Sequence, residues 1–263
     1  MCGFVGWLDK APADRSILER MTTTLTHRGP DAAGYHLEGP IALGHRRLAV
    51  IDLAASQQPM HSACGRYSLA YNGELYNFKT LRAELQAKGV QFRTNGDTEV
   101  LLQSLIAWGD GALPKLEGMF AFAFWDKQTE SLLLARDPLG IKPLNIYQDG
   151  QRILFASELK AILAQAGIPV LANDTHIVPA MVGDPVLAKR ASDILLEEYG
   201  MYVQPINYPT VRKGTERLRI TPTPFHSQAM MEGLRDALVE IFARLGIHYP
   251  ADVAVASGLR LVA

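Results

Sequence analysis

Cysteine, net charge and long hydrophobic runs are all scarce in this sequence of 263 residues. Its two cysteines, Cys2 and Cys64, are too few for the disulfide framework that stabilises small secreted domains. The 26 basic and 27 acidic residues leave a net charge of −1, which gives no electrostatic reason to expect binding to nucleic acid or to a membrane surface. No apolar run approaches the ~18 residues that a membrane span needs.

Targeting signals and metal-binding spacings are also missing. Residues 1–7 lack the basic region that opens a secretory signal, so we expect a cytoplasmic protein. His, Cys, Asp and Glu nowhere follow a metal-ligand spacing, so we expect neither a metal nor another cofactor. The 48% hydrophobic content and the length are those of a globular protein with one or two domains and a sizeable core.

Strand patterns predominate in the first part of the chain, up to about Ala166. We expect strands at residues 4–8, 43–53, 67–71, 119–125, 131–135, 144–147 and 153–156. Helical spacing of apolar residues predicts helices at 16–25, with Ser16 as N-cap, and at 78–85 and 98–108. Many strands with few helices between them favour stacked antiparallel sheets over a doubly wound parallel sheet.

From about residue 167 onward, short strands and longer helices alternate. Strands are expected at 177–182, 202–206 and 218–221, and helices at 185–199 and 229–245. The chain is thus predicted to be an α+β protein with an N-terminal domain over residues 2–166. A junction over 167–172, a small α/β segment over 173–250 and a tail over 251–263 complete the predicted organisation.

Cys2 directly follows the initiator methionine. Removal of Met1 would leave a thiol and a free α-amine, whose ordinary pKa is about 7.7–8.0, in one residue. That amine can accept the thiol proton, directly or through a water molecule, without a histidine. By itself a Met-Cys start is more often a chance feature than a catalytic one. Cys64 belongs to no motif, and we expect it to be an inert thiol.

Seven short motifs along the chain favour a catalytic role for Cys2 over a chance Met-Cys start. They are MCG (1–3), HRGPD (27–31), HRRLAVID (45–52), YNGELYN (71–77), NGDTE (95–99), LEGMFAF (116–122) and RDPLGIKPL (136–144). This set resembles the class II glutamine amidotransferases, which are N-terminal-nucleophile hydrolases, and in particular the glutaminase domain of glutamine-dependent asparagine synthetases. The resemblance covers residues 2–166 and implies a four-layer αββα fold.

The resemblance also implies a catalytic group of three residues. Cys2 is the nucleophile, and the Asn72 side-chain amide and the Gly73 N–H form the oxyanion hole. Two such donors aimed at a developing negative charge are each worth roughly 3–4 kcal/mol. Without its neighbours, Asn72-Gly73 would be interpreted as a hairpin turn.

A substrate-binding set follows from the same resemblance. Arg47 matches the arginine that binds the α-carboxylate of glutamine, and a guanidinium fork suits that task. Arg46 is the neighbouring alternative and should face the opposite side of the strand. The backbones of Leu48 and Val50 match positions that line the glutamine pocket.

Two carboxylates, Asp97 and Glu74, match the pair that receives the substrate ammonium. Asp97 is also a candidate N-cap for the helix expected from Thr98, and the two roles can coexist. The loop at 27–31 is expected to be structural, since the terminal amine makes a histidine base unnecessary. An ion pair between Arg136 and Asp137 is expected to order the loop up to Pro143.

The last third of the chain resembles another family. The motifs QPINYPTV (204–211) and GTERLRITPTP (214–224) are similar to those of the C-terminal domain of 5-aminolevulinate synthases, over residues 173–245. The resemblance implies that Arg219 matches a glycine-carboxylate ligand and Thr210 a contact to the succinyl group. The lysine, aspartate and phosphate site that would hold pyridoxal phosphate have no counterpart, and the cofactor carries that chemistry.

Together these patterns predict an enzyme that hydrolyses glutamine through a thioester on Cys2. The Ser-Gly-Gly-x-Asp-Ser loop of a synthetase domain is absent, and Ser257-Gly258 is only a faint echo of it. Two alternatives stay open: a catalytically idle fusion acting as a binding or assembly module, and a fragment of a pyridoxal-phosphate-dependent synthase. Glutamine is the expected ligand, and the segment from Asn173 is expected to mediate self-association or binding to a separate synthetase chain.

Overall fold

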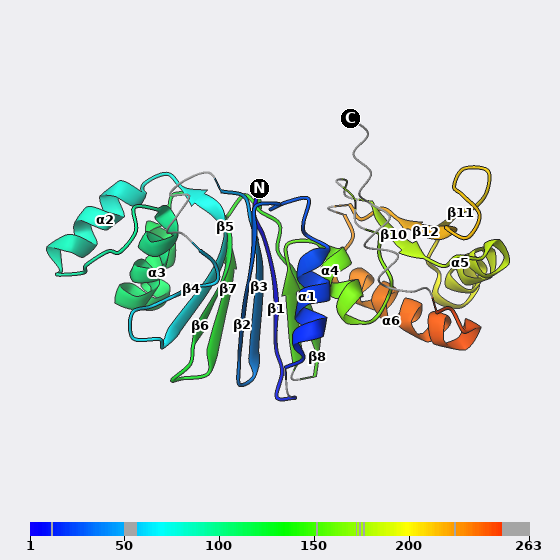
Figure 1. Cartoon of the computed structure of the whole chain (residues 1–263), viewed down its shortest axis with the longest axis horizontal. Coiled ribbons are helices and arrows are strands. Elements are labelled where there is room, and N and C mark those ends of the chain that lie inside the picture. Colours follow the sequence, from blue (N-terminus) through cyan, green and yellow to red (C-terminus); the bar gives the residue numbers. More distant parts are fainter. Residues whose placement is uncertain are drawn as a thin grey trace. The chain divides into compact units, whose positions relative to one another are not determined.

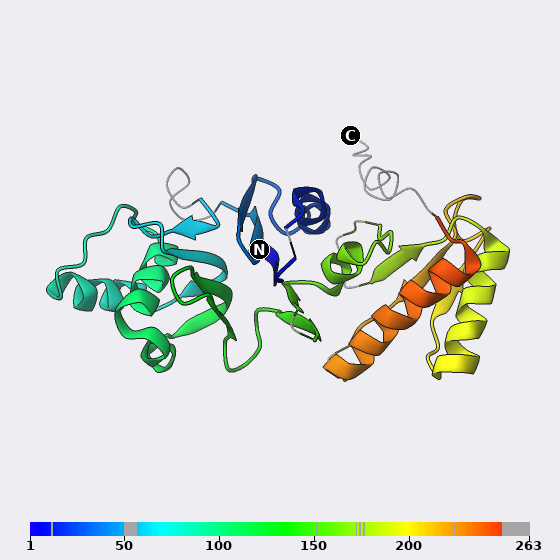
Figure 2. The ribbon, with the colours of Figure 1, turned by 90° about the horizontal axis from the view of Figure 1, so that it is seen from below.

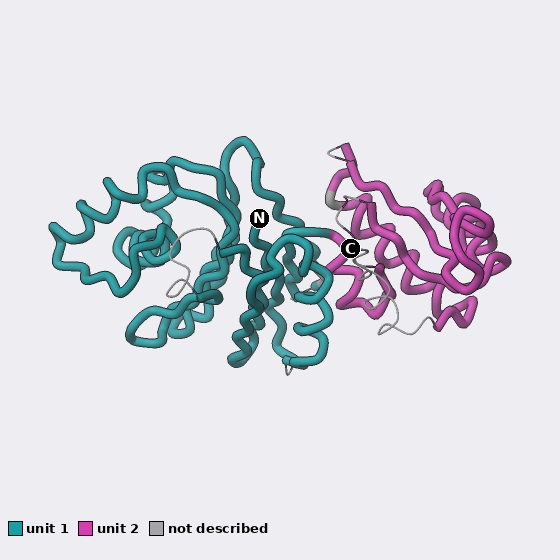
Figure 3. The backbone as a smooth tube through the Cα atoms, turned by 45° about the horizontal axis from the view of Figure 1, so that its top comes forward, with its two compact units in different colours: residues 1–158 teal, residues 159–263 magenta. Residues whose placement is uncertain are grey.

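The computed structural model describes residues 1–248 except 12, 50–56, 151, 172, 174, 176 and 224. The chain forms two compact units, residues 1–158 and 159–263 (Figure 3). The break between them lies eight residues before the predicted domain end at Ala166. The boundary between two compact units need not coincide with the boundary between two family resemblances. The predicted domain boundaries therefore stay a prediction.

Two antiparallel sheets form the centre of the first unit (Figure 1). One sheet has the order β2-β3-β1-β9-β8 and the other the order β4-β5-β6-β7. The strands of the first sheet are β1 (Gly3–Leu8), β2 (Ala32–Glu38), β3 (Ile41–Arg47), β8 (Asn145–Asp149) and β9 (Arg152–Ala156). Those of the second are β4 (Met60–His61), β5 (Tyr67–Leu75), β6 (Gly118–Asp126) and β7 (Ser131–Arg136).

Helices cover the outer face of each sheet (Figure 1). Helix α1 (Arg15–Thr23) packs on β1, β2 and β3, whereas α3 (Asp97–Trp108) packs on β4 and β5. Helix α2 (Phe78–Ala87) and the 3₁₀ helix η1 (Gly109–Lys115) pack against α3. The expected four-layer αββα architecture is therefore confirmed.

Strand β6 shows why the layers form. Its residues alternate between two buried faces, as the two-residue period of a strand requires. Phe120 and Phe122 join the core beneath α3, whereas Ala121, Ala123 and Trp125 join the core between the two sheets. The apolar run at 119–125 thus fills both cores from a single strand.

Three local predictions for the first unit need correction. Asp14, not Ser16, caps α1, because its carboxylate accepts a hydrogen bond from the Ser16 N–H at 2.8 Å. Strand β3 ends at Arg47, earlier than the predicted end at residue 53, which lies outside the described residues. Strands β2 and β4 were not expected, and both lie at a sheet edge.

Within its described residues, the second unit contains a three-stranded antiparallel sheet and three helices. The elements are α4 (Leu159–Gln165), β10 (Val178–Met181), α5 (Pro185–Tyr199), β11 (Gln204–Ile206), β12 (Arg217–Ile220) and α6 (Gln228–Leu245), and the sheet order is β10-β12-β11. Helix α5 starts at the Asp184 N-cap and stops at Gly200, whose φ of +67° suits glycine. It packs on the sheet and alongside α6 (Figure 2). Helix α4 was not predicted.

Candidate active site

The sulfur of Cys2 lies against the chain that leaves β3. Strand register pairs Gly3 with Arg46, so the preceding residue, Cys2, comes to the level of Arg47, and its side chain contacts the next residue, Leu48. The Leu48 N–H donates to Sγ at 3.4 Å, and Sγ lies 3.6 Å from the Leu48 carbonyl oxygen. Cys2 is partly buried. Antiparallel pairing of two strands distant in sequence thereby fixes the thiol at the end of the first sheet.

A cavity of about 220 Å³ opens beside Cys2. It is lined from both sheets, from the start of α3 and from the loop after β7. The sequence-predicted site residues that line it are Cys2, Arg47, Leu48, Asn72, Gly73, Glu74 and Asp97. Val50, the remaining one, lies outside the described residues.

Asn72 and Gly73 present unusual features to this cavity. Asn72 is 1% exposed, and among the described residues its Nδ2 has no hydrogen-bond partner. Leaving a buried donor unpaired costs about 1–3 kcal/mol, so a ligand that accepts from it would recover stability. At Gly73 a Cβ would lie 2.4 Å from the Met119 carbonyl oxygen and 2.7 Å from Phe120 Cα, so no side chain fits.

The two neighbouring arginines face opposite ways, as adjacent residues of a strand do. Arg46 Nε donates to the Gly29 carbonyl at 2.9 Å, which ties β3 to the loop after α1. Arg47 is 9% exposed and lines the cavity. The side chains therefore face as the sequence pattern predicts, and the binding role of Arg47 stays a prediction.

Asp97 is the first residue of α3 and does not cap it. The N-cap is Gly96, which offers no side chain, so the expected capping role of Asp97 is wrong. Instead its Oδ2 accepts from the Tyr71 hydroxyl at 2.9 Å and from the Leu75 N–H at 3.0 Å. Burial raises the pKa of the Asp97 carboxyl, and those two donors partly offset the rise. The carboxylate thus ties α3 to β5 at the cavity wall.

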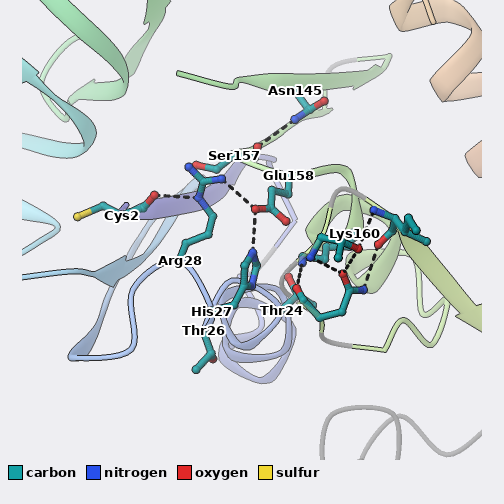
Figure 4. Close-up of polar contacts among 12 residues, drawn as sticks. Cys2, Thr24, Thr26, His27, Arg28, Asn145, Ser157, Glu158 and Lys160 are labelled. Atoms are coloured by element: carbon teal, nitrogen blue, oxygen red, sulfur yellow. Dashed lines mark hydrogen bonds and ion pairs between the residues drawn. The ribbon is translucent and has the colours of Figure 1, made fainter. Parts of the chain in front are cut away.

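Arg28 holds the main chain of Cys2 and was missed as a functional residue (Figure 4). Its Nε donates to the Cys2 carbonyl, and its Nη1 donates to Glu158 Oε1, both at 2.9 Å. His27 Nε2 also lies 2.9 Å from that Glu158 oxygen. The HRGPD loop therefore supports the Cys2 backbone, and its histidine contacts a carboxylate. Only the order of the motifs pointed to this loop, because Arg28 and Glu158 lie 130 residues apart.

The loop after β7 is organised by Asp137 in a way the sequence did not indicate. Its carboxylate accepts from the backbone N–H groups of Phe120, Ile141 and Lys142, at 3.2, 2.9 and 3.0 Å. The expected ion pair with Arg136 is wrong, because the carboxylate satisfies turn N–H groups instead. Although burial opposes it, those N–H donors hold the pKa of Asp137 below its ordinary value. The turn carries Lys142 to the cavity.

Within the described part of the chain, no group of three or more His, Cys, Asp or Glu side chains is arranged to hold a metal ion. Likewise, none of the described helices has the length and apolarity to cross a membrane.

Comparisons with known proteins agree with this geometry. The model of the glutamine amidotransferase domain family matches residues 1–195. Glutamine-hydrolyzing asparagine synthetase 3 of Bacillus subtilis (strain 168) is 44% identical over 184 residues, which cover 67% of this chain and 30% of that protein. The 5-aminolevulinate synthase of Bradyrhizobium diazoefficiens is 56% identical over 92 residues, covering 35% of this chain and 22% of that one.

Among solved structures, a glutamine phosphoribosylpyrophosphate amidotransferase from B. subtilis, complexed with ADP and GMP, is similar with a TM-score of 0.53 and 27% identity. The match covers 62% of this chain and 43% of that one. The chain thus spans less than half of the asparagine synthetase and of the amidotransferase to which it is similar. The family model, these relatives and the αββα layers together show that the chain belongs to the glutamine amidotransferase domain family, as a class II enzyme.

Proposed function

We propose that this chain hydrolyses glutamine to glutamate and ammonia through a thioester on Cys2. The observation that carries the proposal is the buried amide of Asn72, which has no hydrogen-bond partner in the described part of the chain and lines the same cavity as the Cys2 thiol. A nucleophile and an unused donor on one cavity are what attack on a neutral amide needs.

The first half of the reaction forms the thioester. Removal of Met1 frees the α-amine of Cys2, which takes the thiol proton while Sγ attacks the side-chain carbonyl carbon of glutamine. The oxygen of the tetrahedral intermediate carries the negative charge and accepts from Asn72 Nδ2 and the Gly73 N–H. The protonated amine then gives its proton to the amide nitrogen, the C–N bond breaks, and ammonia leaves.

The second half returns the enzyme to its starting state. A water molecule attacks the thioester carbonyl and gives one proton to the α-amine. The C–S bond breaks as the intermediate collapses, Sγ takes that proton back, and glutamate leaves. The same two donors stabilise the second oxyanion, so one cavity serves both steps.

Substrate recognition uses the charged residues of the cavity. Arg47 binds the α-carboxylate of glutamine, and Glu74 together with Asp97 binds its α-ammonium. Because one Asp97 oxygen already accepts from Tyr71 and Leu75, its position is fixed before substrate arrives. The backbones of Leu48 and Val50 form part of the pocket wall in this proposal.

The test is a glutaminase assay on protein whose N-terminal mass shows that it begins at Cys2. We expect glutamate and ammonia in equal amounts, a glutamyl adduct on the N-terminal peptide after rapid quenching, and no turnover by Cys2→Ala protein with an unchanged circular dichroism spectrum. The Cys64→Ala protein is the matched control and should keep full activity, because Cys64 is exposed and does not line the cavity. Equal turnover by Cys2→Ala would contradict the assignment of the nucleophile. Retention of Met1 in the protein isolated from cells would block the amine and favour the idle-module alternative.

The fate of the ammonia is a further part of the proposal. Because the relatives include glutamine-hydrolyzing asparagine synthetases, we propose that a synthetase partner takes it up. The likeness to 5-aminolevulinate synthase covers 22% of that protein and supports kinship of the second unit, so no pyridoxal-phosphate chemistry is proposed.

A further inference from the structure

Lys142 is a buried cation at the cavity that the mechanism above leaves without a role. Its side chain is 5% exposed, and its Nζ lies 3.2 Å from Met1 Sδ. Its backbone N–H donates to Asp137 Oδ2, so the loop after β7 fixes where the side chain starts. Among the described residues, no carboxylate pairs with the ammonium group.

Such an ammonium group is costly to bury. A thioether is a weak acceptor and carries no charge to offset a cation. By contrast, two exposed lysines of this unit have acidic partners: Lys127 contacts Glu38, and Lys115 lies 3.4 Å from Glu84. An unpaired buried charge calls for a compensating role, since desolvation of an ammonium group is costly.

Removal of Met1 changes what Lys142 faces. The methionine side chain that now contacts its Nζ departs, and the new terminal amine belongs to Cys2, one residue along the same chain. Lys142 and Cys2 line the same cavity. The cation then shares its cavity with a group that must be uncharged to accept a proton.

The charges around the chain terminus act in both directions. Burial lowers the pKa of the Met1 amine, and the Arg28 and Lys142 cations lower it further. The Cys2 thiolate and the Asp31 carboxylate act in the opposite direction. The remaining charged groups that line the cavity are Arg47, Glu74 and Asp97.

We propose that Lys142 holds the α-amine of mature Cys2 in its neutral, proton-accepting form. Lys142 acts on the reaction through the Cys2 amine and is in this sense a positioning residue. The inference rests on the proposed glutaminase function. A cation disfavours protonation of a neighbouring amine, so the Lys142 side chain keeps the amine ready to accept the thiol proton in the first step.

The experiment compares pH profiles of kcat/KM for glutamine in Lys142→Met, which removes the charge at similar size, and in Lys142→Arg, which keeps it. Without the charge, the amine should protonate more readily, so the acidic limb of the profile should move to higher pH by about 0.5 to 1 unit. At pH values where the amine is mostly protonated in both proteins, this shift corresponds to a roughly three- to tenfold lower kcat/KM. Lys142→Arg should keep the wild-type limb, and Lys127→Met, which removes an exposed lysine, is the matched control.

A second measurement needs no turnover. The rate of acylation of the N-terminal amine against pH, followed by the mass of the N-terminal peptide, gives the pKa of that amine in the native wild-type protein. We expect a value below the ordinary range of about 7.7–8.0 and a higher value in Lys142→Met. An unshifted acidic limb in folded Lys142→Met, or a wild-type amine in the ordinary range, would overturn the inference. A wild-type protein without glutaminase activity would instead defeat the proposed function, and the labelling experiment would still decide on Lys142.

Discussion

The two units each contain a cavity, and the smaller of the two cavities is the one to which we assign the proposed chemistry. The cavity of the second unit measures about 390 Å³, against about 220 Å³ in the first. The larger one is lined mainly by apolar and aromatic side chains, with Arg219 and His226 as its titratable members besides tyrosines. The smaller one combines a thiol, an unpartnered amide, cations and carboxylates. Convergent polar groups therefore identify a site better than volume does.

The difference originates in the way each unit is built. In the first unit the ends of β3 and β5, which belong to opposite sheets, meet the N terminus, and the start of α3 and the loop after β7 join them, so polar groups from distant chain segments converge. In the second unit the cavity lies between one strand of a small sheet and the helices around it. Arg219 is exposed there, and no cysteine lines the cavity. Arg219 matches a carboxylate ligand only by resemblance, and with no thiol nucleophile beside it among the described residues we expect it to bind no substrate in this chain.

The largest expected effect on the first cavity comes from a change at Asn72. Asn72→Ala should lower kcat by about 10²–10³-fold with little change in KM, because the lost donor acts on the oxyanion. Asn77→Ala, from the same sequence motif but outside the cavity, is the matched control. Steady-state kinetics on both variants measures the effect, and equal losses in the two would show that the unpartnered amide of Asn72 has no special role.

The next effect concerns the two arginines of β3. Arg47→Ala should raise KM for glutamine by roughly 10- to 100-fold, because it removes a charge-assisted contact present in the ground and transition states alike. Arg46→Ala should raise it far less, since that side chain binds the Gly29 carbonyl. Isothermal titration with glutamine on Cys2→Ala backgrounds separates binding from turnover. A larger loss of glutamine affinity in Arg46→Ala than in Arg47→Ala would show that Arg46, and not Arg47, contacts the substrate.

The first unit should also respond to acid through His45, which is 1% exposed and bonds the Tyr71 carbonyl at 3.0 Å across the two sheets. Burial lowers the pKa of His45 to about 4. The unfolded chain takes up a proton below about pH 6.5 and the folded one does not, so the stability present above pH 6.5 is lost as the pH falls toward 4. The loss should reach about 3 kcal/mol, and His45→Gln should flatten this part of the profile.

Tryptophan fluorescence is the right probe, because all three tryptophans, Trp7, Trp108 and Trp125, lie in the first unit. Urea unfolding at several pH values would give the free energy of unfolding of that unit for both proteins. If the free energy of unfolding depended on pH in the same way in wild type and His45→Gln, the buried imidazole would be ruled out as the source of the acid sensitivity.

The smallest expected effect concerns the second unit and its exposed apolar side chains, among them Phe225 at 94%, Tyr202 at 68% and Met230 at 52% exposure. We predict weak, concentration-dependent self-association, or binding of a separate partner chain, through the segment from Asn173 onward. Sedimentation of the full chain should show it, and a triple change of these side chains to serine should abolish it while glutaminase activity stays. A full-length chain that is monomeric at every concentration and captures no partner would defeat the prediction.

Much of the fold could be predicted because local patterns carry it. The apolar run at 119–125 predicted a strand buried on both faces, and β6 has that character. Strand β2 was missed, since Gly34 and neighbouring alanines weaken its pattern. The need for glycine at position 34 comes from a contact distant in sequence, because a Cβ there would lie 1.9 Å from the Gln58 carbonyl oxygen. Helix α4, with only seven residues, is too short for a clear helical period.

For the site, the sequence by itself determined which residue types are present and in which order, and the order of the motifs was enough to indicate the family. Only the tertiary structure decided that Asp97 ties α3 to Tyr71, that Arg28 holds the Cys2 carbonyl, and that the Asn72 amide is left unpaired. It also brought Lys142 to Met1, across 141 positions of the sequence. The physical reason is that these contacts follow from the register of antiparallel strands and the packing of two sheets, which no local pattern of residues records.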